Sequence, residues 1–242
     1  MWAHVMLVWA IAAYLLPDPL DEESFRTRRR WLTFVFVRAT LATAVTAALS
    51  ANLPLVTLVL VASVTLPIAR SRISARHSAE LEIGTNVIVA GTSLLFVTRN
   101  SLELERVILA VPVSNDRISV ICIVIALLFF TIHGGTYVVR GVLNKSGAVP
   151  MVGVEGEKKI DVKEFNRGRL IGVLERILLF AVVIAGSYEA LGFIIAAKGL
   201  IRSREFEQNR DMTEYFLIGS LASVLVALTT GSIARHLLAL YK

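Results

Sequence analysis

The sequence predicts an all-α protein: a polytopic transmembrane helical bundle of about seven spans, N-outside and C-inside, with a small cytoplasmic β-hairpin insertion. Two observations predict this class. Hydrophobic residues make up 55% of the 242 residues, charged residues make up 18%, and the mean hydropathy is +0.69, all outside the range of ordinary soluble domains. The apolar residues also gather in long runs that short polar segments separate.

Each apolar run approaches the roughly 20 residues that a spanning helix needs. Pro17 and Pro19 end the first run, and Asn52 with Pro54 predicts a tight turn between the second and the third. The first run lacks the basic start and the cleavage site of a secretory signal, so we expect it to be retained. The predicted spans are residues 1–16, 31–50, 53–69, 83–97, 118–139, 170–197 and 214–234.

Lys and Arg are unevenly distributed among the connecting segments. With the N-terminus outside, 16 of them lie on the cytoplasmic side and seven on the other, which is the positive-inside bias of a multi-pass protein in an inner (plasma) membrane. Apolar residues alternate on either side of the EGEKK stretch, which predicts the β-hairpin. The predicted organisation is N-terminal transmembrane helices over 1–143, a polar loop or hairpin over 144–169 and a C-terminal helix pair over 170–242.

The residues that commonly perform catalysis are scattered. The four histidines fall in different segments, the aspartates fall in separate loops, and the single cysteine, Cys122, lies inside an apolar run. Neither a metal-ligand spacing nor a phosphate-binding loop is present. We therefore expect a protein that is not an enzyme and that uses neither a metal nor a cofactor.

Charged residues inside the apolar runs are the most informative feature, because a charge near the bilayer centre costs about 2.5–3.5 kcal/mol on insertion scales. In one interpretation they pair with each other in a static bundle. In the other they line a hydrated passage and set ion preference or gating. The pore or gating candidates are Arg38, Glu175, Arg176, Glu189 and Lys198.

Small residues recur at helical spacing in the last two predicted spans, and such stripes allow helices to approach closely in a membrane. Two glycines share a stripe with both glutamates, so that face is expected to contact protein or water rather than lipid. We expect the last two spans to make the contacts between subunits. The helix-packing candidates are Gly172, Gly186, Gly219, Ser223 and Ala227.

The basic segments also have two interpretations. They follow from the positive-inside rule and from attraction to anionic membrane lipids, or they form a collar for an anionic ligand such as a nucleotide or single-stranded nucleic acid. The ligand-binding candidates are Arg28, Arg29, Arg30, Lys158, Lys159, Lys163, Arg167 and Arg169.

Three stretches carry a resemblance to known families: GRLIGVLER at 168–176, YEALGFIIAAKGLIR at 188–202 and EYFLIGSLASVLVAL at 214–228. They resemble the C-terminal half of a bacterial multi-pass membrane family of unknown function. That family often opens with a His and Asp motif, of which this chain retains His4. The overall plan also resembles the membrane channel effectors of the Hailong anti-phage defence system. This resemblance implies a homotetramer, an ion pathway and a cytoplasmic site for single-stranded DNA oligomers that a partner nucleotidyltransferase makes.

These observations together predict an oligomeric ion channel that acts as a gated effector in bacterial anti-phage defence, under the control of an anionic nucleotide or oligonucleotide. Two alternatives stay open. A small multi-pass transporter would build its site from broken helices, for which Gly91, Gly134 and Gly135 are the hints. A non-catalytic membrane accessory protein would use the charged residues for static pairing.

Overall fold

Apolar and small side chains fold the chain into two helical units. The computed structural model describes residues 2–14, 28–49, 53–99, 117–148, 151–152, 159–160, 162–206 and 210–239. Unit 1 lies within Met1–Ser74 and Leu81–Phe130, and unit 2 lies within Ala75–Glu80 and Thr131–Leu240. The chain passes from one unit to the other inside a continuous helical stretch, Arg117–Ser146.

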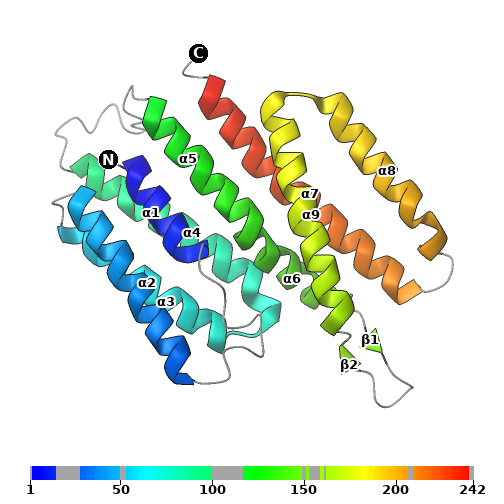
Figure 1. Cartoon of the computed structure of the whole chain (residues 1–242), viewed down its shortest axis with the longest axis horizontal. Helices are drawn as coiled ribbons and strands as arrows, with labels where there is room; N and C mark the ends of the chain where they lie inside the picture. The colour runs from blue at the N-terminus through cyan, green and yellow to red at the C-terminus, as the bar shows by residue number, and fades with distance from the viewer. Residues whose placement is uncertain are drawn as a thin grey trace. The chain divides into compact units, whose positions relative to one another are not determined.

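Unit 1 contains α1 (Trp2–Tyr14), α2 (Arg28–Leu49), α3 (Leu53–Arg72), most of α4 (Ser78–Arg99) and α5 (Arg117–Phe129). α2 and α3 pack against each other, and α1 packs against both α2 and α5 (Figure 1). The core mixes large and small side chains, which lets the helices approach closely. Its buried members include Trp9, Ala13, Leu66, Val89 and Ala126.

Unit 2 begins with a short 3₁₀ helix, Ala75–His77, and contains α6 (Gly135–Ser146), α7 (Val162–Ala185), α8 (Tyr188–Phe206) and α9 (Arg210–Ala239). α7 lies along α9, α6 contacts α9, and α8 folds back beside α7 (Figure 1). A five-residue π-helical segment, Phe130–Gly134, joins α5 to α6. Gly147, with φ of 74°, ends α6 in the left-handed conformation that glycine adopts easily.

The number of membrane spans differs from the sequence-based prediction of about seven. Among the described residues, two helical stretches are long and apolar enough to cross a membrane, Arg117–Ser146 and Thr213–Ala239. α1 has 13 residues, a length of about 20 Å at 1.5 Å per residue, which is shorter than the hydrocarbon core. Val35–Ala47 and Val56–Arg70 are shorter apolar stretches. The seven-span prediction is therefore wrong, and the N-outside, C-inside orientation loses the span count on which it was based.

The predicted span over 170–197 fails for a local reason. α7 ends at Ala185, Gly186 takes a φ of +77°, and α8 starts again at Tyr188. The amide of Gly186 donates to Val183 O (3.1 Å) and that of Ser187 donates to Val182 O (3.2 Å), the two hydrogen bonds of a Schellman C-cap. The apolar run therefore forms a helical hairpin, and Glu175 and Glu189 do not share one helix.

The predicted β-hairpin insertion is also wrong. β1 (Met151–Val152) and β2 (Lys159–Ile160) pair antiparallel over two residues each, and the residues between them lie outside the described ranges. Both ends of the predicted insertion over 144–169 are helical, because α6 extends to Ser146 and α7 already begins at Val162. Among the described residues of the segment, β structure is thus limited to two residue pairs, and the flanking helices take both of its ends.

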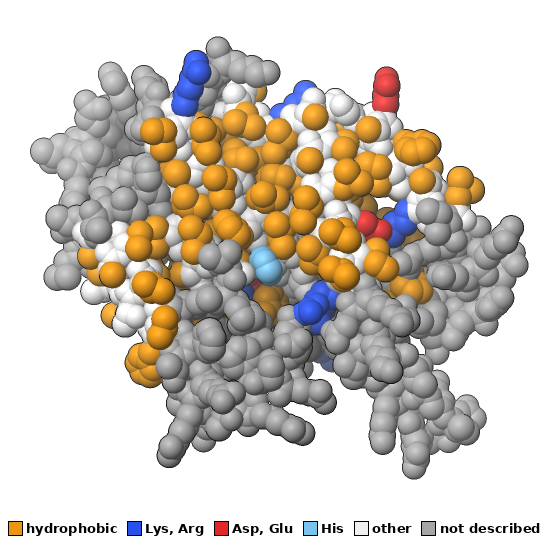
Figure 2. Space-filling view, viewed as in Figure 1, with side chains coloured by type: hydrophobic (Ala, Val, Ile, Leu, Met, Phe, Trp, Pro, Cys, Tyr) orange, Lys and Arg blue, Asp and Glu red, His pale blue; other side chains and the backbone are white. Residues whose placement is uncertain are grey.

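Burial in α9 is the reverse of that in a soluble amphipathic helix. Its outer face carries Leu217, Leu221 and Leu225, which are 53%, 62% and 66% exposed, whereas Ser223 and Ala227 are buried. Large apolar side chains facing outward and small ones facing inward are typical of helices surrounded by lipid. Among the described residues in Figure 2, hydrophobic side chains predominate and few charged groups lie among them.

Candidate functional site

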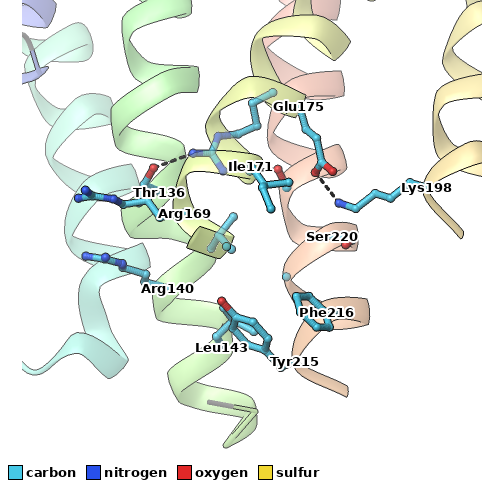
Figure 3. A pocket seen from close by; sticks show the side chains of 16 residues that line it. Thr136, Arg140, Leu143, Arg169, Ile171, Glu175, Lys198, Tyr215, Phe216 and Ser220 are labelled. Carbon is cyan, nitrogen blue, oxygen red and sulfur yellow. Dashed lines mark hydrogen bonds and ion pairs between the residues drawn. The ribbon is translucent and has the colours of Figure 1, made fainter. Parts of the chain in front are cut away.

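A pocket of about 70 Å³ lies within unit 2, among α6, α7, α8 and α9. Its volume suffices for several water molecules or a small polar group. Figure 3 shows Glu175 and Lys198 pointing toward each other, with Arg140 and Arg169 on the α6 side. Hydroxyl groups add to the polar wall. They belong to Thr136, Tyr215, Ser220 and Ser223.

Glu175 on α7 and Lys198 on α8 form an ion pair in this pocket. Their side chains are 21% and 22% exposed, so both charges are largely removed from solvent. A charge pair in such surroundings is screened less than one at the surface, and removal of either partner leaves the other poorly compensated. The pair therefore ties α8 to α7 through a contact that depends on charge.

Arg176, the next residue of α7, points into the protein and is 2% exposed. Its Nε donates to Thr131 O (2.8 Å), and its Nη2 donates to Ile132 O (3.1 Å). Both acceptors belong to the π-helical segment, where the wider i→i+5 register disturbs the regular α-helical hydrogen bonding. The guanidinium thus supplies donors to backbone carbonyls that lie at the change of register.

Hydroxyl groups complete the surroundings of this guanidinium. Nη2 also donates to Thr136 Oγ1 (2.6 Å), and Nη1 donates to Ser223 Oγ (3.4 Å). Gly135 leaves the space that the arginine occupies, because a Cβ there would lie 3.0 Å from its Nε. Arg176 is accordingly a buried structural cation that connects α7 to the π segment and to α9.

The turn between α7 and α8 is held from α9. The guanidinium of Arg235 lies against Gly186, where a Cβ would come within 2.7 Å of its carbon, and it stacks 5.3 Å from the ring centre of Tyr188. A cation at the C-terminal end of α7 is also favourable for the helix dipole. This contact fixes where α8 starts and therefore where Lys198 can reach Glu175.

The pocket brings together three of the five pore or gating candidates. Glu175, Arg176 and Lys198 all line it. Glu189 lies instead on the first turn of α8 with an exposed side chain. Arg38 lies on α2 in unit 1, and the position of its side chain is outside what the structure describes. In the static interpretation the charged residues pair with each other, and the structure gives Lys198 as the partner of Glu175.

Of the ligand-binding candidates, Arg169 lines the pocket. Lys158 lies outside the described residues. For the other six candidates the structure does not describe the side chains; they are Arg28, Arg29, Arg30, Lys159, Lys163 and Arg167. The packing candidates Gly172, Gly219 and Ser223 also line the pocket, and Ala227 is fully buried. Gly186 makes the turn described above. In this single chain, the small stripe of α9 is buried within unit 2.

Sequence reasoning missed a second polar network, which lies in unit 1. Glu82 is fully buried and accepts hydrogen bonds from Arg70 Nε (2.6 Å) and from the hydroxyl of Tyr14 (3.0 Å). Asn86 donates to the Tyr14 hydroxyl and accepts from Trp9 Nε1 (3.1 Å). Arg70 also donates to Ala13 O (3.3 Å) and lies over the Tyr14 ring. These linked bonds join α1, α3 and α4.

The spacing of Glu82 and Asn86 could have indicated this network. The two residues are one helical turn apart, so they share a face of the helix. The predicted span over 53–69 ends one residue before Arg70 and so leaves it outside the apolar segment. In the structure α3 continues to Arg72, which carries Arg70 into the core.

Within the described residues, no group of three or more His, Cys, Asp or Glu side chains is placed to hold a metal ion. The pocket offers the Glu175–Lys198 ion pair, three arginines and several hydroxyl groups. A comparison of the chain with protein-family models, curated proteins and solved structures gives no match. The resemblances to the Hailong effectors and to the multi-pass family therefore stay predictions.

Proposed function

We propose that the chain is a subunit of an oligomeric ion channel in a bacterial plasma membrane, with the Glu175–Lys198 pair as part of its gate. The observation that carries the proposal is this half-buried ion pair between α7 and α8, set in a pocket beside the candidate span of α9. When two helices separate, each charged side chain of a pair between them can bind water in place of its partner. Such a pair can therefore close a path in one state and leave it hydrated in the other.

The inverted burial pattern supports the membrane part of the proposal. α5 repeats what α9 shows, because Ile118 and Ile121 are 57% and 52% exposed while Ser119 and Cys122 are buried. Both helices belong to the two candidate spans. Burying a large aliphatic side chain contributes about 1.5–3 kcal/mol, so lipid or a neighbouring subunit is the favourable surrounding for these faces.

The helical hairpin of α7 and α8 supports the gating part. α8 carries large exposed apolar side chains, including Phe193 and Leu200 at 75% each. Besides the turn at Gly186, the Glu175–Lys198 ion pair connects α8 to α7. A movement of α8 about this turn would separate Glu175 from Lys198 while Arg176 keeps α7 in place.

The proposed control is by an anionic nucleotide or oligonucleotide on the cytoplasmic side, in an anti-phage response. Its support is the density of Lys and Arg in residues 26–30 and 158–169 and the resemblance to the Hailong effectors. Arg169 connects this basic stretch with the pocket, because it lines the wall opposite Lys198. Neutralisation of phosphates by such residues makes binding strongly dependent on salt.

The direct test is electrical recording from the purified chain in a planar bilayer. Stepwise unitary currents are expected. Glu175→Gln and Lys198→Gln should each change the open fraction, and the exchange of Glu175→Lys with Lys198→Glu should restore it towards the wild type. Lys145→Gln is the matched control, because Lys145 forms an exposed ion pair with Glu80 in the same unit. Absence of current for the wild type under all conditions would remove the channel proposal.

A static accessory protein is the second candidate, and the burial of Arg176 favours it. All donor atoms of this side chain have acceptors, so this charge serves the fold rather than a passage. An accessory protein would give no current, and Glu175→Gln would alter its stability alone.

A further inference from the structure

We propose that the pocket of unit 2 binds a phosphate group carried by an anionic phospholipid whose acyl chains lie along α7 and α9. The proposal depends on the membrane location in the proposed function but not on ion conduction. It assigns a ligand class to a site that is otherwise described as a gate.

The charges around the pocket favour an anion. Four basic side chains, Arg140, Arg169, Arg176 and Lys198, line it together with one described acidic side chain, Glu175, which gives a formal charge of +3. Arginine can donate to a phosphate while keeping a bond to a neighbour, because its guanidinium carries five N–H groups in a planar fork. Ser220 and Tyr215 add hydroxyl groups to the same wall.

Apolar residues interleave with these basic and hydroxyl groups. Arg169 is followed by Leu170, which is 62% exposed, and Ser220 lies between Leu217 and Leu221 at 53% and 62%. These leucines offer an apolar surface beside the polar wall of the pocket. A soluble phosphate needs the polar wall only, whereas a phospholipid uses both parts at once.

Aromatic residues place the pocket near the level of lipid headgroups. Tyr215 and Phe216 line it from the first residues of the candidate span Thr213–Ala239, with ring centres 5.1 Å apart. Tyrosine concentrates at the boundary between the hydrocarbon core and the headgroups. Basic pockets between transmembrane helices at this depth bind anionic headgroups. The depth therefore favours a lipid over a ligand from solution.

The test uses the full chain purified in a nonionic detergent. Binding of short-chain phosphatidylglycerol, phosphatidylcholine and soluble glycerol phosphate is measured by thermophoresis, together with a short single-stranded DNA oligomer. We expect phosphatidylglycerol to bind at least tenfold more tightly than phosphatidylcholine and glycerol phosphate to bind weakly. The difference between the two lipids should shrink as salt is raised.

Two kinds of variant locate the site. Arg140→Gln with Arg169→Gln should remove most of the preference for phosphatidylglycerol, and Ser220→Leu should weaken binding by filling the pocket without changing its charge. Arg72→Gln is the matched control, since Arg72 is exposed and lies in unit 1. Size-exclusion profiles and circular dichroism of each variant show whether it is folded.

Equal binding of both lipids, or a preference that survives in Ser220→Leu and in the folded double variant, overturns the proposal. Glycerol phosphate binding as tightly as the lipid would show a free phosphate to be the ligand and would also overturn it. So would displacement of the lipid by the DNA oligomer at lower concentration, although that result would support the oligonucleotide control of the proposed function. Because no current is measured in this assay, failure of lipid binding leaves the channel proposal standing.

Discussion

Arg176 Nε donates to the carbonyl oxygen of Thr131, 2.8 Å away and 45 residues earlier in the chain. Thr131 also donates from its hydroxyl to Thr230 Oγ1 (2.7 Å) on α9, so the π segment is held from two helices. A charged residue in an apolar helix, which would be read as part of a pore, here keeps a helical irregularity in place. Its neighbour Glu175 makes the ion pair of the pocket with Lys198 (Figure 3).

Replacement of Arg176 by methionine should destabilise the protein strongly. The variant leaves the carbonyls of Thr131 and Ile132 without these donors inside unit 2. Each lost hydrogen bond from a charged donor is worth about 1.5–3 kcal/mol, and we expect a decrease of at least about 3 kcal/mol in the free energy of unfolding. The measurement is unfolding in mixed detergent followed by circular dichroism, with Arg169→Met as the control at the pocket wall. Equal stability of the two variants would contradict a structural role specific to Arg176.

Two glycines of α9 should respond to alanine in opposite ways. A Cβ at Gly231 would lie 2.9 Å from the branched Cβ of Val183, so Gly231→Ala should push α9 from α7 and cost about 1–3 kcal/mol. A Cβ at Gly219 would meet Leu143 at an ordinary 3.7 Å. Gly219→Ala should therefore be neutral or stabilise by up to about 1 kcal/mol, since alanine favours helix. Thermal unfolding of both variants measures the difference, and a larger loss at Gly219 would contradict the packing described here.

Gly186→Ala tests the turn between α7 and α8. Alanine in the left-handed conformation costs about 1–2 kcal/mol, and its Cβ would also collide with the guanidinium of Arg235. Gly147 is the matched control, because it has φ of 74° but open space around a Cβ. We expect Gly186→Ala to lose more stability than Gly147→Ala in the same unfolding assay. Equal losses would mean that Arg235 moves away at no energetic cost.

The sequence predicts helices and their approximate positions well, because apolar runs, proline and glycine act locally. The two candidate spans contain the predicted segments 118–139 and 214–234, whose composition is continuously apolar. The segment 170–197 is also apolar on average, but it contains Gly186. Mean hydropathy does not reveal that this glycine adopts the left-handed conformation and ends a helix. Counting apolar residues therefore overestimated the number of spans.

The pocket was partly predictable. Glu175, Arg176 and Lys198 stand out from composition alone, because charges in apolar runs need partners. Their pairing was not predictable, since the hairpin that brings Lys198 to Glu175 depends on the turn at Gly186. The role of Arg176 depends on the π segment, which follows from packing between helices rather than from the local sequence. In the same way, the length of α3 decides that Arg70 is buried.

The Arg70–Glu82 pair gives the sharpest prediction for unit 1. Both side chains are almost fully buried, at 4% and 0% exposure, and Glu82 also accepts from Tyr14. Glu82→Gln should cost about 3–5 kcal/mol, because Arg70 keeps a buried charge that its partner no longer balances. The double variant Arg70→Met, Glu82→Leu should lose less than Glu82→Gln, since neither charge stays behind. Tyr14→Phe removes one hydrogen bond to the carboxylate and should cost about 1.5–3 kcal/mol.

A thermodynamic cycle of Arg70→Met, Glu82→Leu and their double variant separates pairing from burial. If the double variant is less stable than Glu82→Gln, the pair stabilises the unit beyond what apolar side chains of similar size provide. If the two single variants add without coupling, Arg70 and Glu82 do not interact in solution. Ion pairing predicts strong coupling, because the 2.6 Å contact lies where solvent screens it little. Unfolding in detergent at low and high salt should therefore give nearly the same coupling energy, in contrast to the exposed Lys145–Glu80 pair, whose coupling should fall with salt.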